Sequence, residues 1–207
     1  MTDMPSFGVL CCGKDITELA EAVKCCDRIT KIMKNGGFTL GGYHTAVAKK
    51  DGGEKEKMCG DKLYHLARLS DVLFTVGCDG FSCDDIIPDI TTKLCESEVA
   101  FFTSNLCGLY NIGNYDKGKK EAFLPSRSRA GILKNCLVLN IRSDCRFIDA
   151  VLPSLLPSLS FAVTGLCGKN AKDSCRLISE FEKLYKSYGT PRSELFKRVQ
   201  KVEINKI

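Results

Sequence analysis

The sequence predicts a three-layer α/β/α domain built on a doubly wound, mostly parallel sheet. Short apolar runs, such as residues 7–12 and 72–76, have the length and continuity of strands that are buried on both faces. Longer stretches in which apolar residues recur at helical spacing separate these runs. Strands that alternate with helices form a parallel sheet covered on both faces, and ligands bind beyond the carboxyl ends of such strands.

Local signals define the elements of the N-terminal half. Asp15 with Glu18 three residues later is a capping-box pattern, so we expect a helix from this point. Asn35 and the two glycines that follow it form a helix stop signal. The other elements expected here are strands over residues 7–12, 38–47 and 72–76 and a helix over residues 55–69.

The middle of the chain is less regular. We expect a helix over about residues 85–95, followed by a stretch in which Phe101 and Phe102 are buried. Residues 111–120 have the composition of an exposed polar insertion. Order resumes with a clear core strand over residues 135–141.

A further helix is expected from Cys145. Either Ser143 or Asp144 can cap it, because both side chains accept hydrogen bonds from helix N–H groups. Pro153 and Pro157 should break or kink this helix, since proline removes a backbone donor and crowds the preceding turn.

Length and charge indicate one main domain and a C-terminal extension. A chain of 207 residues with 44% hydrophobic residues can bury one sizeable core, which we place in residues 5–168. From Lys169 onward Lys and Arg outnumber Asp and Glu by ten to five, so the whole net charge of +5 lies in a basic helical extension at 169–207. This distribution argues against a nucleic-acid-binding domain.

Composition also indicates a reduced, cytoplasmic setting. No run of 18 apolar residues and no signal-peptide pattern is present, so we expect no contact with a membrane. The thirteen cysteines include no Cys-x-x-Cys pair, and only His44 and His65 could add imidazole ligands. This pattern argues against structural zinc, and reduced cysteines that serve as small apolar residues explain the count better.

Residues 71–92 combine a buried strand, a glycine turn and a helix start. Gly77 and Gly80 bracket the turn, where glycine permits positive φ angles or close packing whether or not a ligand binds. Unpaired backbone N–H groups and the helix dipole point outward at such a place, so this arrangement predicts an anion site.

Four pieces of the chain carry a family resemblance. They are Gly8-Val-Leu10, Thr75-Val-Gly-Cys-Asp-Gly-Phe-Ser-Cys-Asp-Asp-Ile-Ile-Pro-Asp-Ile-Thr91, Ser126-Arg127 through Gly131 to Leu137-Val-Leu-Asn140, and Val151-Leu-Pro153 with Leu156-Pro157. The second piece resembles the Thr-Thr-Gly-Gly-Thr-Gly-x-x-x-Arg-Asp-Val-Thr-Pro pattern of the molybdopterin-binding domain family, which includes molybdopterin adenylyltransferases and the gephyrin G domain. The four pieces cover roughly residues 7–163 in the family's order.

The resemblance implies a homotrimer whose small-molecule substrate is molybdopterin, a pterin dithiolene with a phosphate group. Adenylyltransferase members use ATP and Mg²⁺ to transfer AMP to that phosphate. Two family aspartates that carry catalysis and hold the magnesium fall on Asp51 and Asp85. The family's substrate-binding positions fall on Gly77, Cys78, Asp79, Gly80, Ser126, Asn140, Arg142 and Ser143.

Several of these positions depart from the family pattern. Cys78 replaces a glycine and brings a Cβ to a place where backbone should approach a ligand closely. Asp79 and Asp84 replace a threonine and an arginine, so they repel a phosphate unless a cation such as Mg²⁺ intervenes. Arg142 lies where the family has a Leu-Pro-Gly loop and can recover one phosphate contact.

Three functions stay open on these residues. The first is adenylyl transfer to molybdopterin, and the second is a catalytically inactive binding or scaffold protein with the same trimeric fold. The third is another phosphoanhydride chemistry, as in nucleotide-processing proteins of the competence-damage-inducible type. Individual residues also keep two interpretations: Asp85 is a helix N-cap or a metal ligand, Asp51 is a solvated loop residue or a catalytic one, and the thiols of Cys78 and Cys83 are reactive or inert.

Overall fold

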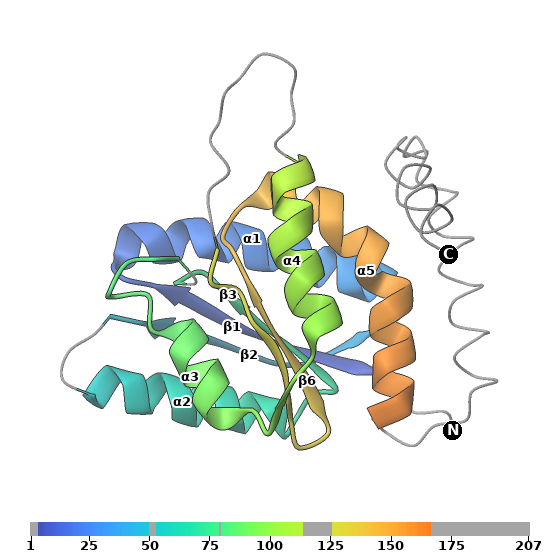
Figure 1. The fold of residues 1–207 in the computed structure, drawn as a ribbon, viewed down its shortest axis with the longest axis horizontal. Coiled ribbons are helices and arrows are strands. Elements are labelled where there is room, and N and C mark those ends of the chain that lie inside the picture. The colour runs from blue at the N-terminus through green and yellow to red at the C-terminus, as the bar shows by residue number, and fades with distance from the viewer. Residues whose placement is uncertain (1–3, 50–52, 79, 114–125, 167–207) are drawn as a thin grey trace, which may run out of the picture.

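The protein forms a mixed sheet with helices on both faces, in a computed structural model that describes residues 4–49, 53–78, 80–113 and 126–166 (Figure 1). Within these residues the sheet has six strands in the order β2-β1-β3-β6-β5-β4. Neighbours among β2, β1, β3 and β6 pair in parallel, whereas β5 is antiparallel to β6 and β4 to β5. The strands are β1 (Ser6–Gly13), β2 (Thr39–Val47), β3 (Val72–Val76), β4 (Ser97–Glu98), β5 (Ala130–Leu133) and β6 (Cys136–Ile141).

Two apolar clusters fill the space on either side of the sheet. One lies under α1 (Ile16–Asn35), α4 (Ala100–Gly113) and α5 (Cys145–Leu166), and the other lies under α2 (Glu54–Ala67) and α3 (Ile87–Leu94). Successive residues of β1 alternate between the two clusters, because side chains of a strand point to opposite faces. The predicted three-layer α/β/α class, with its doubly wound, mostly parallel sheet, is therefore confirmed.

The ends of two helices also match the sequence signals. At the start of α1, the Asp15 carboxylate accepts a hydrogen bond from the Glu18 amide at 2.9 Å, and the helix ends at Asn35 as expected. At the start of α5, the Asp144 carboxylate accepts from the amides of Arg146 and Phe147 at 2.9 and 3.2 Å. Asp144 rather than Ser143 is therefore the cap.

Helix α5 is not broken at its prolines, which contradicts one of the two outcomes expected there; a kink stays a prediction. Pro153 and Pro157 lie inside one continuous helix of 22 residues, although a proline in a helix interior costs about 3 kcal/mol. Ten residues of α5 are buried, and each large apolar side chain contributes about 1.5–3 kcal/mol on burial, so packing outweighs the two lost donors.

Packing in the core also explains the apolar composition of α5. Among the described residues, it is the one helix long and apolar enough to cross a membrane by length and composition. Its buried residues, among them Phe147, Leu152, Leu159 and Val163, pack in the core cluster shared with α1. Core packing against the sheet accounts for its hydropathy.

Three further features differ from the sequence-based expectations or lie beyond the described part. Phe102 is 3% exposed but Phe101 is 55% exposed, because consecutive residues of a helix point in directions about 100° apart. The short strands β4 and β5 were not expected, since runs of two and four residues carry little periodicity. Most of the polar insertion and the whole of the basic extension at 169–207 lie outside the described residues, so the proposed domain boundary stays a prediction.

Candidate functional site

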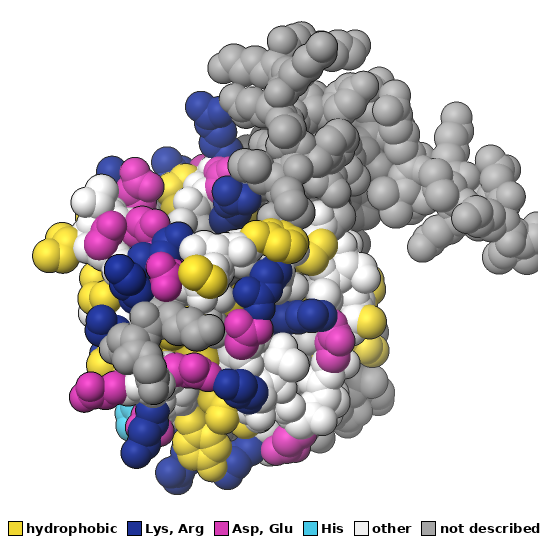
Figure 2. Space-filling model, turned by 60° about the vertical axis from the view of Figure 1, so that its left-hand side comes forward, with side chains coloured by type: hydrophobic (Ala, Val, Ile, Leu, Met, Phe, Trp, Pro, Cys, Tyr) yellow, Lys and Arg dark blue, Asp and Glu magenta, His cyan; other side chains and the backbone are white. Residues whose placement is uncertain are grey.

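The candidate site lies where the parallel strands end. Cys11 of β1 pairs with Val76 of β3, which pairs with Ile141 of β6, so the three carboxyl ends are level. The Gly77 amide donates to the Ile141 carbonyl at 2.9 Å and joins the segments that follow β3 and β6. Figure 2 turns the side of the molecule where the β1 arrow ends toward the reader and shows basic and acidic side chains mixed over this face.

The turn after β3 has the left-handed backbone that its glycine predicts. Gly77 has φ of 89°, and a Cβ on it would meet the Cys12 carbonyl oxygen at 2.4 Å, so only glycine fits. Cys78 continues the turn with φ of 54°, a conformation that is uncommon for a residue with a side chain. Cys78 therefore adopts the left-handed conformation that a glycine would favour at this position.

The Cys78 side chain is directed into the core. It is 7% exposed and packs in the apolar cluster under α2 and α3. Burial, and then the negative charge of Asp85, raises the pKa of the Cys78 thiol to about 12. The thiol therefore stays protonated at neutral pH, which argues against a nucleophilic role.

We expect iodoacetamide at pH 8 to modify Cys83 well before Cys78. Cys83 is exposed, whereas a buried thiol with a pKa of about 12 supplies only about one thiolate in ten thousand at this pH. Fragment spectra of the peptide that holds both cysteines would distinguish the two sites over a time course. Equal rates at the two positions would contradict the inward orientation of Cys78.

Asp85 is positioned by the turn and not by the helix after it. Its carboxylate accepts a hydrogen bond from the Ser82 amide at 2.9 Å, and a Cβ on Gly80 would lie 2.7 Å from its Oδ2. The N-cap of α3 is Ile86, without a side-chain cap bond, so the N-cap interpretation of Asp85 is wrong. Gly80 is needed here because it makes room for this carboxylate.

A lysine neutralises Asp85. The ammonium of Lys14, in the residue directly after β1, lies 3.4 Å from Asp85 Oδ1 and 3.4 Å from Glu18 Oε1. Burial by itself would lower the pKa of Lys14, but the carboxylates of Asp85 and then Glu18 outweigh it and raise that pKa. Lys14 was not predicted as a site residue, although its place at the carboxyl end of β1 is a signal that could have found it.

Asn140 lies beneath this surface and has its polar atoms bonded within the protein. Its amide nitrogen donates to the hydroxyl oxygens of Thr75 at 2.7 Å and Thr91 at 2.9 Å. Its amide oxygen accepts from the Arg129 amide at 3.2 Å, and the residue is fully buried. Asn140 therefore ties β3, β6 and α3 together, and direct contact with a substrate would require these bonds to break.

The other predicted positions are divided between the site and its surroundings. Arg142 and Ser143 are half-buried in the loop between β6 and α5, next to the Gly77 turn. Ser126 forms a local turn, in which its hydroxyl accepts from the Ser128 amide at 3.0 Å. Asp51 and Asp79 lie outside the described residues, so the shared cleft of Asp51 and Asp85 stays a prediction.

Among the described residues, the Asp85 carboxylate is engaged by protein groups and is not arranged to hold a magnesium ion. None of the described residues form a group of three or more His, Cys, Asp and Glu side chains that could hold a metal. One oxygen of Asp85 accepts from Ser82 and the other faces the Lys14 ammonium, whereas Mg²⁺ requires near-octahedral oxygen ligands. The predicted magnesium role of Asp85 thus conflicts with its ion pair.

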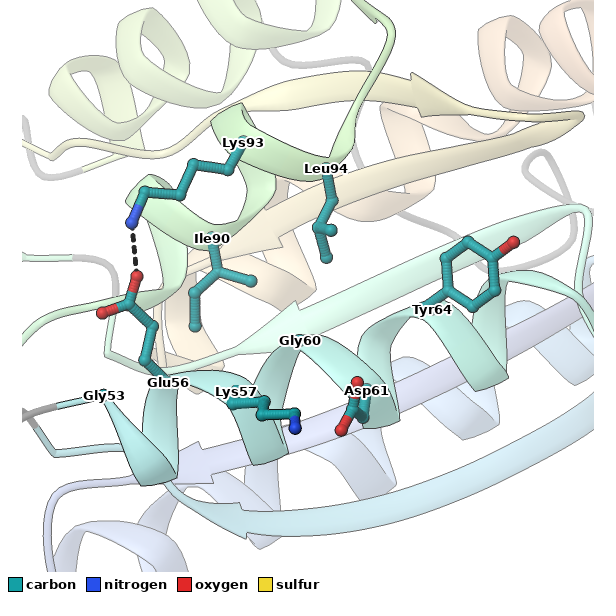
Figure 3. Close-up of a pocket in the computed structure, with 9 residues that line it drawn as sticks. All are labelled: Gly53, Glu56, Lys57, Gly60, Asp61, Tyr64, Ile90, Lys93 and Leu94. Carbon is teal, nitrogen blue, oxygen red and sulfur yellow. Dashed lines mark hydrogen bonds and ion pairs between the residues drawn. The ribbon is translucent and has the colours of Figure 1, made fainter.

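A groove with a volume of about 450 Å³ lies elsewhere, between α2 and α3 (Figure 3). Gly60, Ile90 and Leu94 form its apolar part, and an ion pair between Glu56 and Lys93 crosses one end. None of the predicted site residues line this groove, so it is separate from the turn after β3.

Comparison with known proteins identifies the fold. No family model and no curated protein sequence matches the chain. Solved structures do match: a molybdopterin biosynthesis enzyme MoaB from Thermus thermophilus has 22% identity and a TM-score of 0.64 over 80% of this chain and 98% of its own. A molybdopterin biosynthesis protein from Mycobacterium abscessus has 21% identity and a TM-score of 0.58 over 79% of this chain and 94% of its own.

A tungsten cofactor synthesizing protein MoaB from Pyrococcus furiosus has 15% identity and a TM-score of 0.63 over 80% of this chain and 99% of its own. Each of these structures is matched over nearly its whole length. At such identities the agreement concerns the backbone and leaves side-chain roles to be argued from this chain. The protein therefore has the fold of a MoaB/MogA-type domain, as its motifs predicted, on a strongly diverged sequence.

Proposed function

We propose that this protein takes part in molybdenum cofactor biosynthesis and binds molybdopterin at the carboxyl edge of its sheet. The observation that carries this proposal is the left-handed turn at Gly77 and Cys78, held between the ends of β1 and β6 in a fold that molybdopterin biosynthesis proteins share. Backbone N–H groups in a left-handed turn are suited to a phosphate.

The charged side chains around the turn support a phosphate ligand. Lys14 follows β1 and Arg142 follows β6, so one cation lies on each side of the turn. In this proposal the turn from Gly77 to Gly80 contacts the phosphate through the backbone N–H groups that follow Gly77, whose own amide is bonded to the Ile141 carbonyl. The Ser143 hydroxyl also contacts the phosphate, and Arg142 adds a charge-assisted hydrogen bond. Asn140 acts from below by holding the strands and α3 in register.

The catalytic form of the proposal is adenylyl transfer. An oxygen of the molybdopterin phosphate would attack the α-phosphorus of ATP, an adenylyl–phosphate bond would form, and pyrophosphate would leave. Asp51 and Asp85 are the candidates for Mg²⁺ ligands in that reaction, but the ion pair of Asp85 with Lys14 opposes this role. That same ion pair favours the second candidate, a binding protein of this fold that has lost catalysis.

The proposal includes assembly as a homotrimer, because the resemblance implies it, and a cytoplasmic location stays the prediction made from composition. Light scattering after size-exclusion chromatography would measure the mass of the assembly in solution. A monomer at tens of micromolar would contradict the trimer but leave the binding proposal intact.

The binding proposal predicts that molybdopterin raises the melting temperature. A ligand at one hundred times its dissociation constant stabilises the folded state by about 2.7 kcal/mol, which corresponds to roughly 5–10 °C for a chain of this size. Arg142→Gln should reduce the shift, and Arg146→Gln is the matched control because Arg146 is exposed in the first turn of α5. The proposal is wrong if millimolar molybdopterin leaves the melting temperature of the wild type unchanged.

An assay with ATP labelled at the α-phosphate separates the two forms of the proposal. Transfer of labelled AMP to molybdopterin supports the enzyme, whereas binding without transfer supports the non-catalytic protein. If Asp85→Ala leaves the transfer rate unchanged, the catalytic assignment of Asp85 is wrong.

A further inference from the structure

Lys14, Asp85 and Glu18 form an ion-pair cluster at the candidate site. The Lys14 ammonium lies 3.4 Å from a carboxylate oxygen of each partner. The Asp85 side chain is 7% exposed and that of Lys14 is 27% exposed, so the lysine closes off the buried carboxylate and still reaches the surface. The cluster joins the segment after β1 to the turn after β3, which are far apart in the sequence.

The backbone holds both charges in place. The Lys14 amide donates to Glu18 Oε2 at 3.0 Å, so the lysine is bound to Glu18 through its backbone as well as its side chain. The Ser82 amide orients the Asp85 carboxylate from the other side, and Gly80 leaves room for it. Lys14 is therefore positioned by two elements, unlike a surface lysine that moves freely in solvent.

The ammonium supplies the charge that a phosphate site among carboxylates requires. A lysine is protonated at neutral pH, and the carboxylates of Asp85 and Glu18 raise the pKa of Lys14 further. An ammonium has three N–H donors, and the two carboxylates can occupy two of them, which leaves one for an acceptor at the surface. A divalent ion next to Asp85 would have to approach this positive charge or displace it.

We propose that Lys14 is the built-in cation of this site: it neutralises Asp85 and contacts the phosphate of the ligand, so that molybdopterin binds without a divalent metal. This inference rests on the proposed function and deepens it, because it replaces the expected Mg²⁺ by a residue of the chain. It assigns a ligand-binding role to Lys14 and a positioning role to Asp85.

Calorimetric titration of the full chain with molybdopterin tests this inference. In wild type the affinity should agree within about twofold between a buffer with EDTA and a buffer with millimolar Mg²⁺. Lys14→Met should weaken binding roughly 10- to 100-fold in both buffers, the loss that corresponds to one charged hydrogen bond. Lys24→Met is the matched control, since Lys24 is an exposed lysine on α1, and it should leave the affinity unchanged.

The outcomes separate this inference from the proposed function. Binding that requires Mg²⁺ and survives Lys14→Met would overturn the role of Lys14 while leaving molybdopterin binding intact. If wild type binds molybdopterin in neither buffer, the proposed function itself is wrong. The comparison of the two buffers uses only wild type, so it stays decisive if Lys14→Met fails to fold.

Electron paramagnetic resonance with Mn²⁺ gives a second readout that needs no molybdopterin. We expect no Mn²⁺ bound to wild type at this site at millimolar concentration. Bound Mn²⁺ that is lost in Asp85→Asn would show that the carboxylate accepts a metal despite Lys14, and the inference would be wrong.

Discussion

Asn140→Ala is expected to lower the free energy of unfolding by about 3–5 kcal/mol, because it leaves several buried polar groups without a partner. The side chain donates to Thr75 and Thr91 within the core, and it accepts from the Arg129 amide at a half-buried position. Each unpaired buried group costs about 1–3 kcal/mol, and the space of the missing amide adds a cavity term. Urea denaturation followed by circular dichroism would measure the change in the free energy of unfolding.

Two variants test whether the loss arises from this network. Asn105→Ala removes an amide on α4 that donates to the Phe101 carbonyl at the surface. This change should alter the free energy of unfolding by no more than about 0.5 kcal/mol. Thr91→Val removes one acceptor with little change in shape, and its effect should not add to that of Asn140→Ala. A cost below about 1 kcal/mol for Asn140→Ala would show that the three bonds contribute little.

Gly77→Ala is expected to destabilise the protein by about 2–5 kcal/mol through two separate effects. A side chain in the left-handed region costs about 1–2 kcal/mol, and Gly77 has φ of 89°. The new Cβ would also lie 2.4 Å from the Cys12 carbonyl oxygen, so β1 and β3 must separate locally. Thermal and urea unfolding would measure the loss, and molybdopterin binding should weaken because the turn moves.

Gly37→Ala separates the two effects. Gly37 has nearly the same φ, 83°, but a Cβ there would meet only the end of the Met4 side chain at 3.8 Å. Its cost should therefore be the backbone cost alone, about 1–2 kcal/mol. If Gly77→Ala costs no more than Gly37→Ala, the close approach to Cys12 has no energetic consequence.

Most of the fold could be predicted from local patterns. The strand at Val72–Val76 has the bounds that its apolar run predicted, and Asp15 caps α1 as its spacing from Glu18 indicated. These features follow from neighbouring residues, since periodicity and caps act over one or two turns of chain. Local patterns were less reliable where packing decides: the break expected in α5 is absent, because the buried face of this helix holds it together through Pro153 and Pro157.

The candidate site could be predicted only in part. The turn at Gly77 was identified correctly because glycine there meets a backbone requirement that is visible in the sequence. The ion pair of Asp85 could not be predicted in this way, since its partner Lys14 follows a different strand, β1. Asn140 was expected to face a ligand, but its partners Thr75 and Thr91, 65 and 49 positions away, bind it in the core.

The alternation of strands and helices, the glycine turn after β3 and the resemblance to a family of molybdopterin-binding domains all follow from the residues and their spacing. Which charges and amides meet at that turn depends on the tertiary structure. The physical reason is that side-chain periodicity records which face of an element is buried, while ion pairs and hydrogen bonds between elements depend on how the strands are ordered. In this protein that order places Lys14 beside Asp85, and it thereby sets the charge of the site.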